Sequence, residues 1–174
     1  MGLLTAFLCL TAMTSCNDDS DLSPDREIAN DLPGTWILHE APGTTSRDTR
    51  DVRLDFTASN FTATYQRKTD SRTYSYSVSG TWKVYKKVLE LTYNVSTLYT
   101  TGMTAQEVDA LTILFNDNNA NLRDKPDTQP LGMNVEITRS YSNGTGSLRL
   151  SGYNPDFAGT YTLKPDPGVW PPLN

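Results

Sequence analysis

Cysteine and histidine are nearly absent from this chain of 174 residues. It contains two cysteines, Cys9 and Cys16, and a single histidine, His39. Both cysteines lie in the first tenth of the sequence, so the rest of the chain has neither a disulfide framework nor thiolate ligands for zinc. One histidine without a second imidazole does not make a zinc site either. We therefore expect the folded domain to hold no metal and no cofactor.

Positive charge is also scarce. The chain has 15 Lys and Arg against 20 Asp and Glu, a formal net charge of −5 at pH 7, and its basic residues form no stripe. A surface that binds nucleic acid needs such a stripe to contact the phosphates. The sequence therefore argues against a nucleic-acid partner.

The apolar run at the start of the chain is too short to cross a bilayer. Leu3–Met13 contains eleven residues without a charge, whereas a helix that spans the hydrocarbon core needs about 20. Eleven is a typical length for the apolar part of a secretory signal peptide. We predict that residues 1–15 are a signal peptide, removed on export.

Small residues precede Cys16 in the sequence Met13-Thr14-Ser15-Cys16. This stretch resembles the lipobox of bacterial lipoproteins, which implies that Cys16 is acylated and becomes the new N-terminus. The acidic run at residues 17–21 resembles the export signal of Bacteroidetes lipoproteins. Together they imply a lipid anchor in the outer membrane, with the protein facing the cell exterior. Two or more acyl chains give stable anchoring, and residues 16–31 are interpreted as the acylated cysteine and a polar tether. An ordinary secretory signal with an incidental cysteine is the alternative.

Apolar and polar residues alternate repeatedly from residue 32 onward, which is typical of strands with one buried face. In Thr73–Val84, one face carries the residues Tyr74, Tyr76, Val78, Gly80, Trp82 and Val84. Turn signals separate the alternating runs, among them Lys86-Lys87 and Asn143-Gly144. We expect the Asn-Gly pair to form a type I′ turn with both residues at positive φ. About eight sequential antiparallel strands are predicted, beginning with Thr35–Glu40.

One segment has helical periodicity instead. The sequence Thr104-Ala105-Gln106-Glu107 fits a capping box, and Val108, Leu111 and Leu122 follow at helical spacing. We predict a helix from about Ala105 to Asn119 or slightly beyond. Residues 116–121 are rich in asparagine, and they lack the glycine and the closing glutamate of a calcium-binding EF-hand loop. They are interpreted as a solvated helix end.

Eight strands with one apolar face either close into a barrel or divide between two sheets. Closure removes the unpaired edges, and short connections between sequential strands favour it. We predict an all-β, up-and-down antiparallel barrel of about eight strands with one inserted helix. A two-sheet sandwich is the alternative.

Two motifs resemble a known family. Leu32-Pro33-Gly34-Thr35-Trp36 resembles the opening of lipocalin-like and other calycin proteins, and Ser79–Val84, followed by a tight turn and a Leu-x-Leu strand, resembles one of their central strands. The resemblance implies a lipocalin-like lipoprotein of the Bacteroidetes type, with its barrel domain at residues 32–174. It also implies that Gly34 and Trp36 close one end of the barrel beneath a basic side chain, for which Lys164 is the candidate. The helix lies before the last three strands rather than after the eighth, which favours the wider calycin-like class.

Aromatic residues crowd the inferred inner faces. A buried tyrosine hydroxyl needs a hydrogen-bond partner, which a polar ligand or water can supply. A barrel of eight strands either holds one small ligand or is filled by side chains, and the sequence leaves both open. The candidate ligand-binding residues are Tyr65, Tyr74, Tyr76, Trp82, Tyr93 and Tyr161.

No catalytic set is evident. The alternation places His39, Glu90 and Glu136 on outward faces, whereas Glu40 shares the inward parity of Trp36. One inward acid does not make a hydrolytic site, which needs a pair of carboxylates or a nucleophile with its base. We expect the protein not to be an enzyme.

The expected function is therefore binding. The leading hypothesis is a surface-tethered, non-catalytic lipoprotein that holds a small amphipathic molecule or a glycan fragment in the barrel. The alternative is a protein-interaction or structural module of the cell envelope with a filled barrel. The proline-rich tail after Lys164 cannot form a strand, and Trp170 either plugs a barrel end or belongs to an exposed polyproline ligand.

Overall fold

The computed structural model describes residues 23–40, 48–124 and 132–164. The predicted signal peptide, Cys16 and the tail with Trp170 lie outside these ranges. The strands are β1 Gly34–Glu40, β2 Thr49–Phe56, β3 Asn60–Lys68, β4 Thr73–Tyr85, β5 Val88–Thr101, β6 Met133–Ser140, β7 Thr145–Gly152 and β8 Gly159–Lys164. The helical elements are α1 Pro24–Asp31, α2 Ala105–Asp124 and the 3₁₀ turn η1 Pro155–Phe157. No helix in the described ranges is both long and apolar enough to cross a bilayer.

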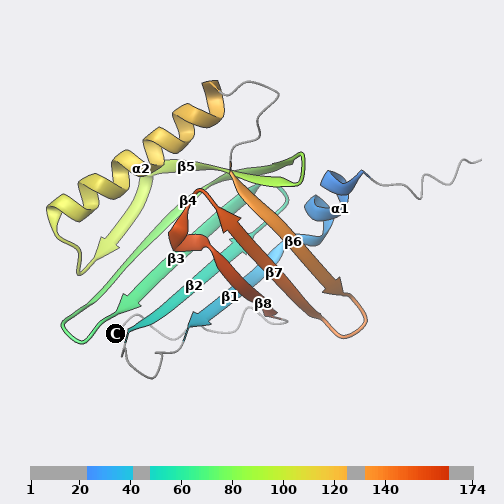
Figure 1. Ribbon diagram of the computed structural model, residues 1–174, viewed down its shortest axis with the longest axis horizontal. Coiled ribbons are helices and arrows are strands. Elements are labelled where there is room, and N and C mark those ends of the chain that lie inside the picture. The colour runs from blue at the N-terminus through green and yellow to red at the C-terminus, as the bar shows by residue number, and fades with distance from the viewer. Residues whose placement is uncertain (1–22, 41–47, 125–131, 165–174) are drawn as a thin grey trace, which may run out of the picture.

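The eight strands form a closed barrel in which each strand pairs antiparallel with its neighbour in sequence (Figure 1). β8 returns to pair with β1, where Trp36 lies opposite Leu163. The predicted up-and-down barrel with one inserted helix is therefore confirmed, and the two-sheet sandwich is excluded. The barrel has two ends. We call the end where β1 begins and β8 finishes the closed end, and the end where β1 finishes and β4 begins the mouth.

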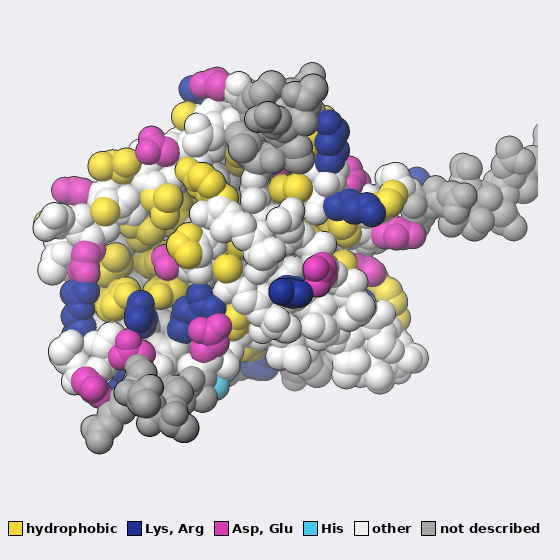
Figure 2. Space-filling model, viewed as in Figure 1, with side chains coloured by type: hydrophobic (Ala, Val, Ile, Leu, Met, Phe, Trp, Pro, Cys, Tyr) yellow, Lys and Arg dark blue, Asp and Glu magenta, His cyan; other side chains and the backbone are white. Residues whose placement is uncertain are grey.

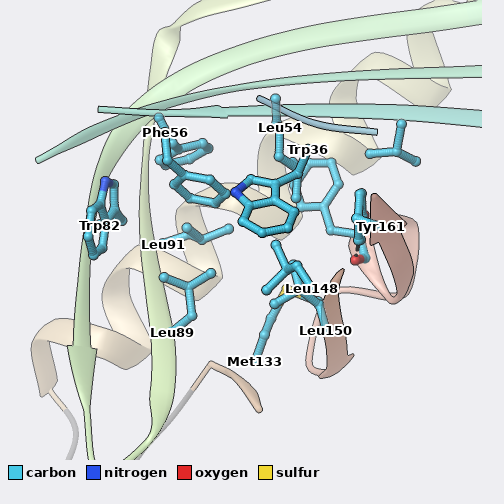
Figure 3. Close-up of a cluster of buried hydrophobic side chains, with 14 of the residues drawn as sticks. Trp36, Leu54, Phe56, Trp82, Leu89, Leu91, Met133, Leu148, Leu150 and Tyr161 are labelled. Carbon is cyan, nitrogen blue, oxygen red and sulfur yellow. Dashed lines mark hydrogen bonds between the residues drawn. The ribbon is translucent and has the colours of Figure 1, made fainter. Parts of the chain in front are cut away.

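The inward-facing side chains of the strands form one hydrophobic core. Trp36 is fully buried, and its indole Nε1–H donates to the carbonyl oxygen of Leu32 at 2.7 Å. Figure 3 shows this ring at the centre of the cluster, with Leu54, Phe56 and Leu148 around it. Burying an aromatic side chain of this size removes roughly 200 Å² from water. The core therefore draws much of its stability from these rings.

The closed end is bent at Gly34, and its brace comes from a residue other than the candidate Lys164. Gly34 has φ 144°, and a Cβ there would lie 2.9 Å from the side chain of Leu163, so this position requires glycine. The basic side chain that the structure places here is Arg139 of β6. Its guanidinium donates to the carbonyl oxygens of Asp31 at 2.9 Å and Pro33 at 2.6 Å.

Helix α1 occupies residues that the sequence assigned to the tether. Ile28 is buried against the barrel core. The carboxylate of Asp25 accepts the backbone N–H groups of Lys86 and Lys87 at 2.8 and 2.6 Å. The folded unit therefore includes α1 as well as the residues from Leu32 onward, and the earlier part of the predicted tether lies outside the described residues.

The predicted type I′ turn lies in a different hairpin. Lys86 and Lys87 have φ 51° and 62°, as both central residues of that turn require, and Asp25 holds them in place. The expectation for Asn143-Gly144 is wrong, because in this hairpin only Gly144 has a positive φ, at 66°. The side chain of Asn143 instead accepts the N–H of Thr145 at 3.1 Å, which favours a longer loop.

Candidate functional site at the barrel mouth

The backbone pairing between β5 and β6 is short. These strands pair at only two positions, Val88 with Asn134 and Leu89 with Met133. Beyond them β5 continues to Thr101, and helix α2 lies along it (Figure 1). An open strand edge presents backbone groups that need partners. The helix must therefore supply what a neighbouring strand would have supplied.

Two asparagine side chains of α2 take over that role. The Asn118 amide donates to the carbonyl oxygen of Leu91 at 2.7 Å. Asn119 makes two bonds to Tyr93, accepting its N–H at 2.8 Å and donating to its carbonyl oxygen at 2.7 Å. A side-chain amide has both a donor and an acceptor, like a peptide group. The edge of β5 is thus satisfied at Leu91 and Tyr93 without a neighbouring strand.

The expectation of a solvated end in α2 is confirmed only for part of this stretch, in which Asn116, Asp117 and Asn121 are exposed. The helix continues to Asp124, and Asn118 is only 8% exposed. Asparagine is a poor helix former in isolation, but here its hydrogen bonds to β5 outweigh that preference. Within the described parts of the chain, no group of three acidic, histidine or cysteine residues could hold a metal ion.

The inner side of α2 closes the barrel interior. Phe115 is fully buried and stacks on the ring of Tyr93, with centroids 4.2 Å apart and an interplanar angle of 19°. It also meets Tyr76 at 6.0 Å in an edge-to-face arrangement. The helix thus inserts an aromatic side chain into the space that a ligand would have occupied.

The segment around η1 fills the interior from the mouth. Tyr161 donates its hydroxyl to the carbonyl oxygen of Phe157 at 2.7 Å, and Phe157 itself is fully buried. The Asn154 amide donates to the hydroxyl oxygen of Tyr93 at 3.2 Å. Tyr76 donates its hydroxyl to Asp156 at 2.9 Å. The chain itself therefore provides the partners that these three tyrosine hydroxyls need.

A pocket of about 280 Å³ lies at the mouth, between α2 and the tyrosines of β3 and β4. It is open to solvent, and Figure 2 shows hydrophobic side chains gathered beside and below α2 on this face. Tyrosine rings form one wall and the first half of α2 forms the other. The lining residues are Tyr65, Tyr74, Tyr76, Met103, Glu107, Ala110, Leu111, Leu114 and Asp156.

The tyrosine wall is ordered by ring contacts. Tyr65 stacks on Tyr76 with centroids 5.1 Å apart, and Tyr74 lies 6.3 Å from Tyr65. Burial, followed by the negative charge of Asp156, raises the pKa of both Tyr65 and Tyr76 above the ordinary tyrosine value. Their hydroxyls therefore stay protonated and remain hydrogen-bond donors at physiological pH.

The rim beside α2 is held by an ion pair. The guanidinium of Arg72 bonds to both carboxylate oxygens of Glu107, one of them at 3.0 Å, and lies 4.8 Å from the ring centroid of Tyr74. Glu107 also accepts the backbone N–H of Thr104 at 2.8 Å, while Thr104 Oγ1 accepts the N–H of Glu107 at 3.3 Å. These bonds confirm the capping box. Arg72 first, and Thr104 second, lower the pKa of Glu107 to about 2.

The six candidate ligand residues divide into two groups. Tyr65, Tyr74 and Tyr76 line the pocket. Trp82 lies near the closed end, where its indole donates to the carbonyl oxygen of Thr57 at 3.0 Å. Tyr93 and Tyr161 are buried with their hydroxyls bonded to the η1 segment.

Sequence reasoning missed the residues that face the tyrosines. Glu107 was identified as a capping residue, but the pattern carried no sign that it borders a pocket. Asp156 lies in the sequence Asn154-Pro155-Asp156, which is typical of a turn, and turn chemistry does not indicate which way a carboxylate points. Leu111 showed helical periodicity, which predicts burial but not a pocket wall.

The carboxylates considered for catalysis are dispersed. Glu40 is 53% exposed and paired with Arg50 at 2.6 Å, and Glu136 is 74% exposed. His39 is exposed beside Asp51. Glu90, expected on the outward face of its strand, is only 1% exposed and pairs with Lys83 at 3.2 Å. Alternation predicts the face of a side chain, but it does not show whether that face is covered.

Comparison with known proteins supports this fold. Residues 32–113 match the family model described as a lipocalin-like domain. This region comprises β1 to β5 and the first half of α2. No curated protein and no solved structure matches the chain. With a closed eight-stranded barrel and an inserted helix, the molecule has a lipocalin-like fold, which suits a ligand-binding or structural module rather than a catalyst.

Proposed function

We propose that this protein is a surface-tethered, non-catalytic binding protein that holds a small amphipathic molecule or a glycan fragment at its barrel mouth. The observation that carries the proposal is the pocket between α2 and the tyrosines of β3 and β4. Ligand sites are typically concave and mostly apolar, with a few polar groups that set orientation. This pocket combines apolar helix residues, three tyrosines and two carboxylates.

The size of the pocket limits the ligand. Its volume of about 280 Å³ lies at the lower end of the usual range of roughly 300 to 1,000 Å³. The deeper barrel is occupied by Phe115, Phe157 and Tyr161, each fully buried or nearly so. The ligand we propose is therefore one ring or a short chain bound at the mouth, rather than a long molecule inside the barrel.

The position of α1 supports the proposed tether. Asp25 contacts the Lys86-Lys87 turn at the closed end, whereas β4 begins with Thr73 at the mouth. A chain that enters through α1 therefore reaches the barrel at the end remote from the pocket (Figure 1). Acylation of Cys16 would leave the mouth facing away from the outer membrane, open to ligands outside the cell.

A single ring substitution tests the binding proposal. We expect Tyr74→Ala to weaken binding of short amphipaths or oligosaccharides about tenfold, because the pocket loses one aromatic wall worth about 1–2 kcal/mol. Affinity is measured by calorimetry, and the binding site by amide chemical shifts at Leu111 and Leu114. Tyr99→Ala is the matched control, since Tyr99 is 72% exposed and does not line the pocket.

The alternative function, a structural or protein-interaction module, predicts a different outcome of this test. The filled interior favours a structural or protein-interaction module, because such a module needs no cavity. In that case neither amphipaths nor oligosaccharides would shift the resonances of Leu111 and Leu114. If Tyr74→Ala and Tyr99→Ala weaken ligand binding equally, this result would also count against binding at the mouth pocket.

A further inference from the structure

The two carboxylates that line the pocket, Glu107 and Asp156, have different partners. Glu107 is paired with Arg72 and Glu40 with Arg50. Asp156 accepts the hydroxyl of Tyr76 at 2.9 Å. Within residues 23–40, 48–124 and 132–164, no Lys, Arg or His forms a salt bridge with it. A partly buried anion therefore borders the pocket without a cation of its own.

The position of Asp156 is well determined. Its backbone N–H donates to the side chain of Asn154 at 3.0 Å, which caps the η1 turn. Arg50 holds the same segment by donating to the carbonyl oxygens of Pro155 at 3.0 Å and Ala158 at 2.7 Å. The carboxylate is thus presented to the pocket by a braced turn, not by a mobile side chain on an open surface.

The rings beside this carboxylate also favour positive charge. A tyrosine ring has a negative face that attracts cations, and Arg72 already uses this property over Tyr74. Asp156 raises the pKa of Tyr65 and Tyr76, after burial, and so contributes negative potential at both rings. Arg67 acts in the opposite direction at Tyr65, but it is paired with Asp48. An anionic ligand would meet this negative potential without a compensating cation from the rim, because Arg72 is already paired with Glu107.

We propose that the mouth pocket selects ligands with an ammonium group, bound by Asp156 and the tyrosine rings, with the apolar part against Met103, Leu111 and Leu114. This inference rests on the proposed function, which requires only that the pocket bind a small amphipath. It adds the charge class of the ligand and names the residue that discriminates. The charge of Arg72 does not oppose the ligand strongly, because Glu107 compensates it.

The test uses three probes with the same benzyl group and different heads. Benzyltrimethylammonium is cationic, N-benzylacetamide is neutral and phenylacetate is anionic. We expect the purified protein to bind the cation about tenfold more tightly than the amide, as a carboxylate with aromatic rings allows, and not to bind the anion measurably. Calorimetry gives the affinities, and shifts at Leu111 and Leu114 confirm the site.

Two variants isolate the charge. Asp156→Asn keeps an oxygen acceptor for Tyr76 and the backbone N–H that Asn154 caps, so we expect the fold to be retained. It should lower the affinity for the cation about tenfold and leave the affinity for the amide within about twofold. Glu136→Gln removes an equal charge from a residue that is 74% exposed and not part of the pocket, and should change neither affinity.

The outcomes separate the two proposals. If the amide binds as tightly as the cation, or if Asp156→Asn leaves the preference intact, selection by charge is overturned while the binding function stands. If none of the three probes shifts Leu111 or Leu114, both the selection and the mouth pocket are rejected. If Glu136→Gln abolishes the preference for the cation as fully as Asp156→Asn does, the preference comes from the net charge of the protein rather than from Asp156. This result would also overturn the inference.

Discussion

The closed end and the mouth of this barrel are built from different chemistry. At the closed end, Trp36 is fully buried, and Arg139 donates to the carbonyl oxygens of Asp31 and Pro33, a few residues earlier in the chain. At the mouth, the tyrosines have polar tips, and the hydroxyl of Tyr76 donates to the carboxylate of Asp156. The first arrangement excludes water and stabilises the fold. The second leaves polar groups, a carboxylate and an open pocket where a ligand can reach them.

This contrast indicates a division between stability and binding. A core aromatic contributes through buried area, which depends little on the identity of neighbouring polar groups. A pocket needs polar groups in defined positions and some access for solvent. Placing the two at opposite ends allows the mouth to change without loss of the core. Three variants test whether stability and binding depend on different parts of the barrel.

The largest effect is expected at the closed end. Trp36→Ala should lower the free energy of unfolding by about 3–5 kcal/mol, because it leaves a cavity in a tightly packed core. Urea denaturation measures this change. Trp36→Phe is the milder companion variant if the alanine form does not fold. Loss of N-benzylacetamide binding in a folded Trp36 variant would show that the two ends are coupled.

A smaller effect is expected where α2 covers β5. Asn119→Ala removes both bonds to the backbone of Tyr93 and should cost about 1–3 kcal/mol, since buried backbone groups lose their partners. Hydrogen exchange at Tyr93 should accelerate at the same time. Asn121→Ala, at an exposed position of the same helix, is the control. If Asn119→Ala and Asn121→Ala change the free energy of unfolding and the hydrogen exchange at Tyr93 equally, the amide side chains do not replace a strand.

The smallest effect concerns the rim of the mouth. Because Arg72 and Thr104 lower the pKa of Glu107 to about 2 from an ordinary 4.5, its charged form stabilises the folded state above pH 4.5. That contribution is lost as the pH falls from about 4.5 to about 2. Glu107→Gln should therefore unfold with a weaker pH dependence in this window. If the stability of the unmodified protein and of Glu107→Gln depends on pH in the same way, solvent screens the Arg72–Glu107 pair completely.

Much of the fold could be predicted because it depends on local alternation. In β4, Tyr76, Val78 and Trp82 are buried, as period-two spacing requires. The capping box placed the start of α2 at the right residue. The type I′ turn was assigned to the wrong hairpin, because the contact that supports Lys86 and Lys87 comes from Asp25 about sixty residues earlier. A local pattern cannot report such a contact.

The candidate site could be predicted only in part. Tyr65, Tyr74 and Tyr76 share an inward face that the alternation revealed, and they do line the pocket. Asp156 and Glu107 come from a turn and a helix far away in sequence. Tyr93 and Tyr161 were equally good candidates by pattern, and only the position of η1 shows that their hydroxyls already have partners.

The sequence alone determined the number and order of the strands, the start of the helix and the inward faces, because these follow from spacing between near neighbours in the chain. The tertiary structure decided that asparagines of α2 replace a strand at part of β5, that η1 fills the interior, and that Asp156 lines the same mouth pocket as three tyrosines. Each of these depends on contacts between distant segments, whose free energy outweighs local preference only once the barrel has closed.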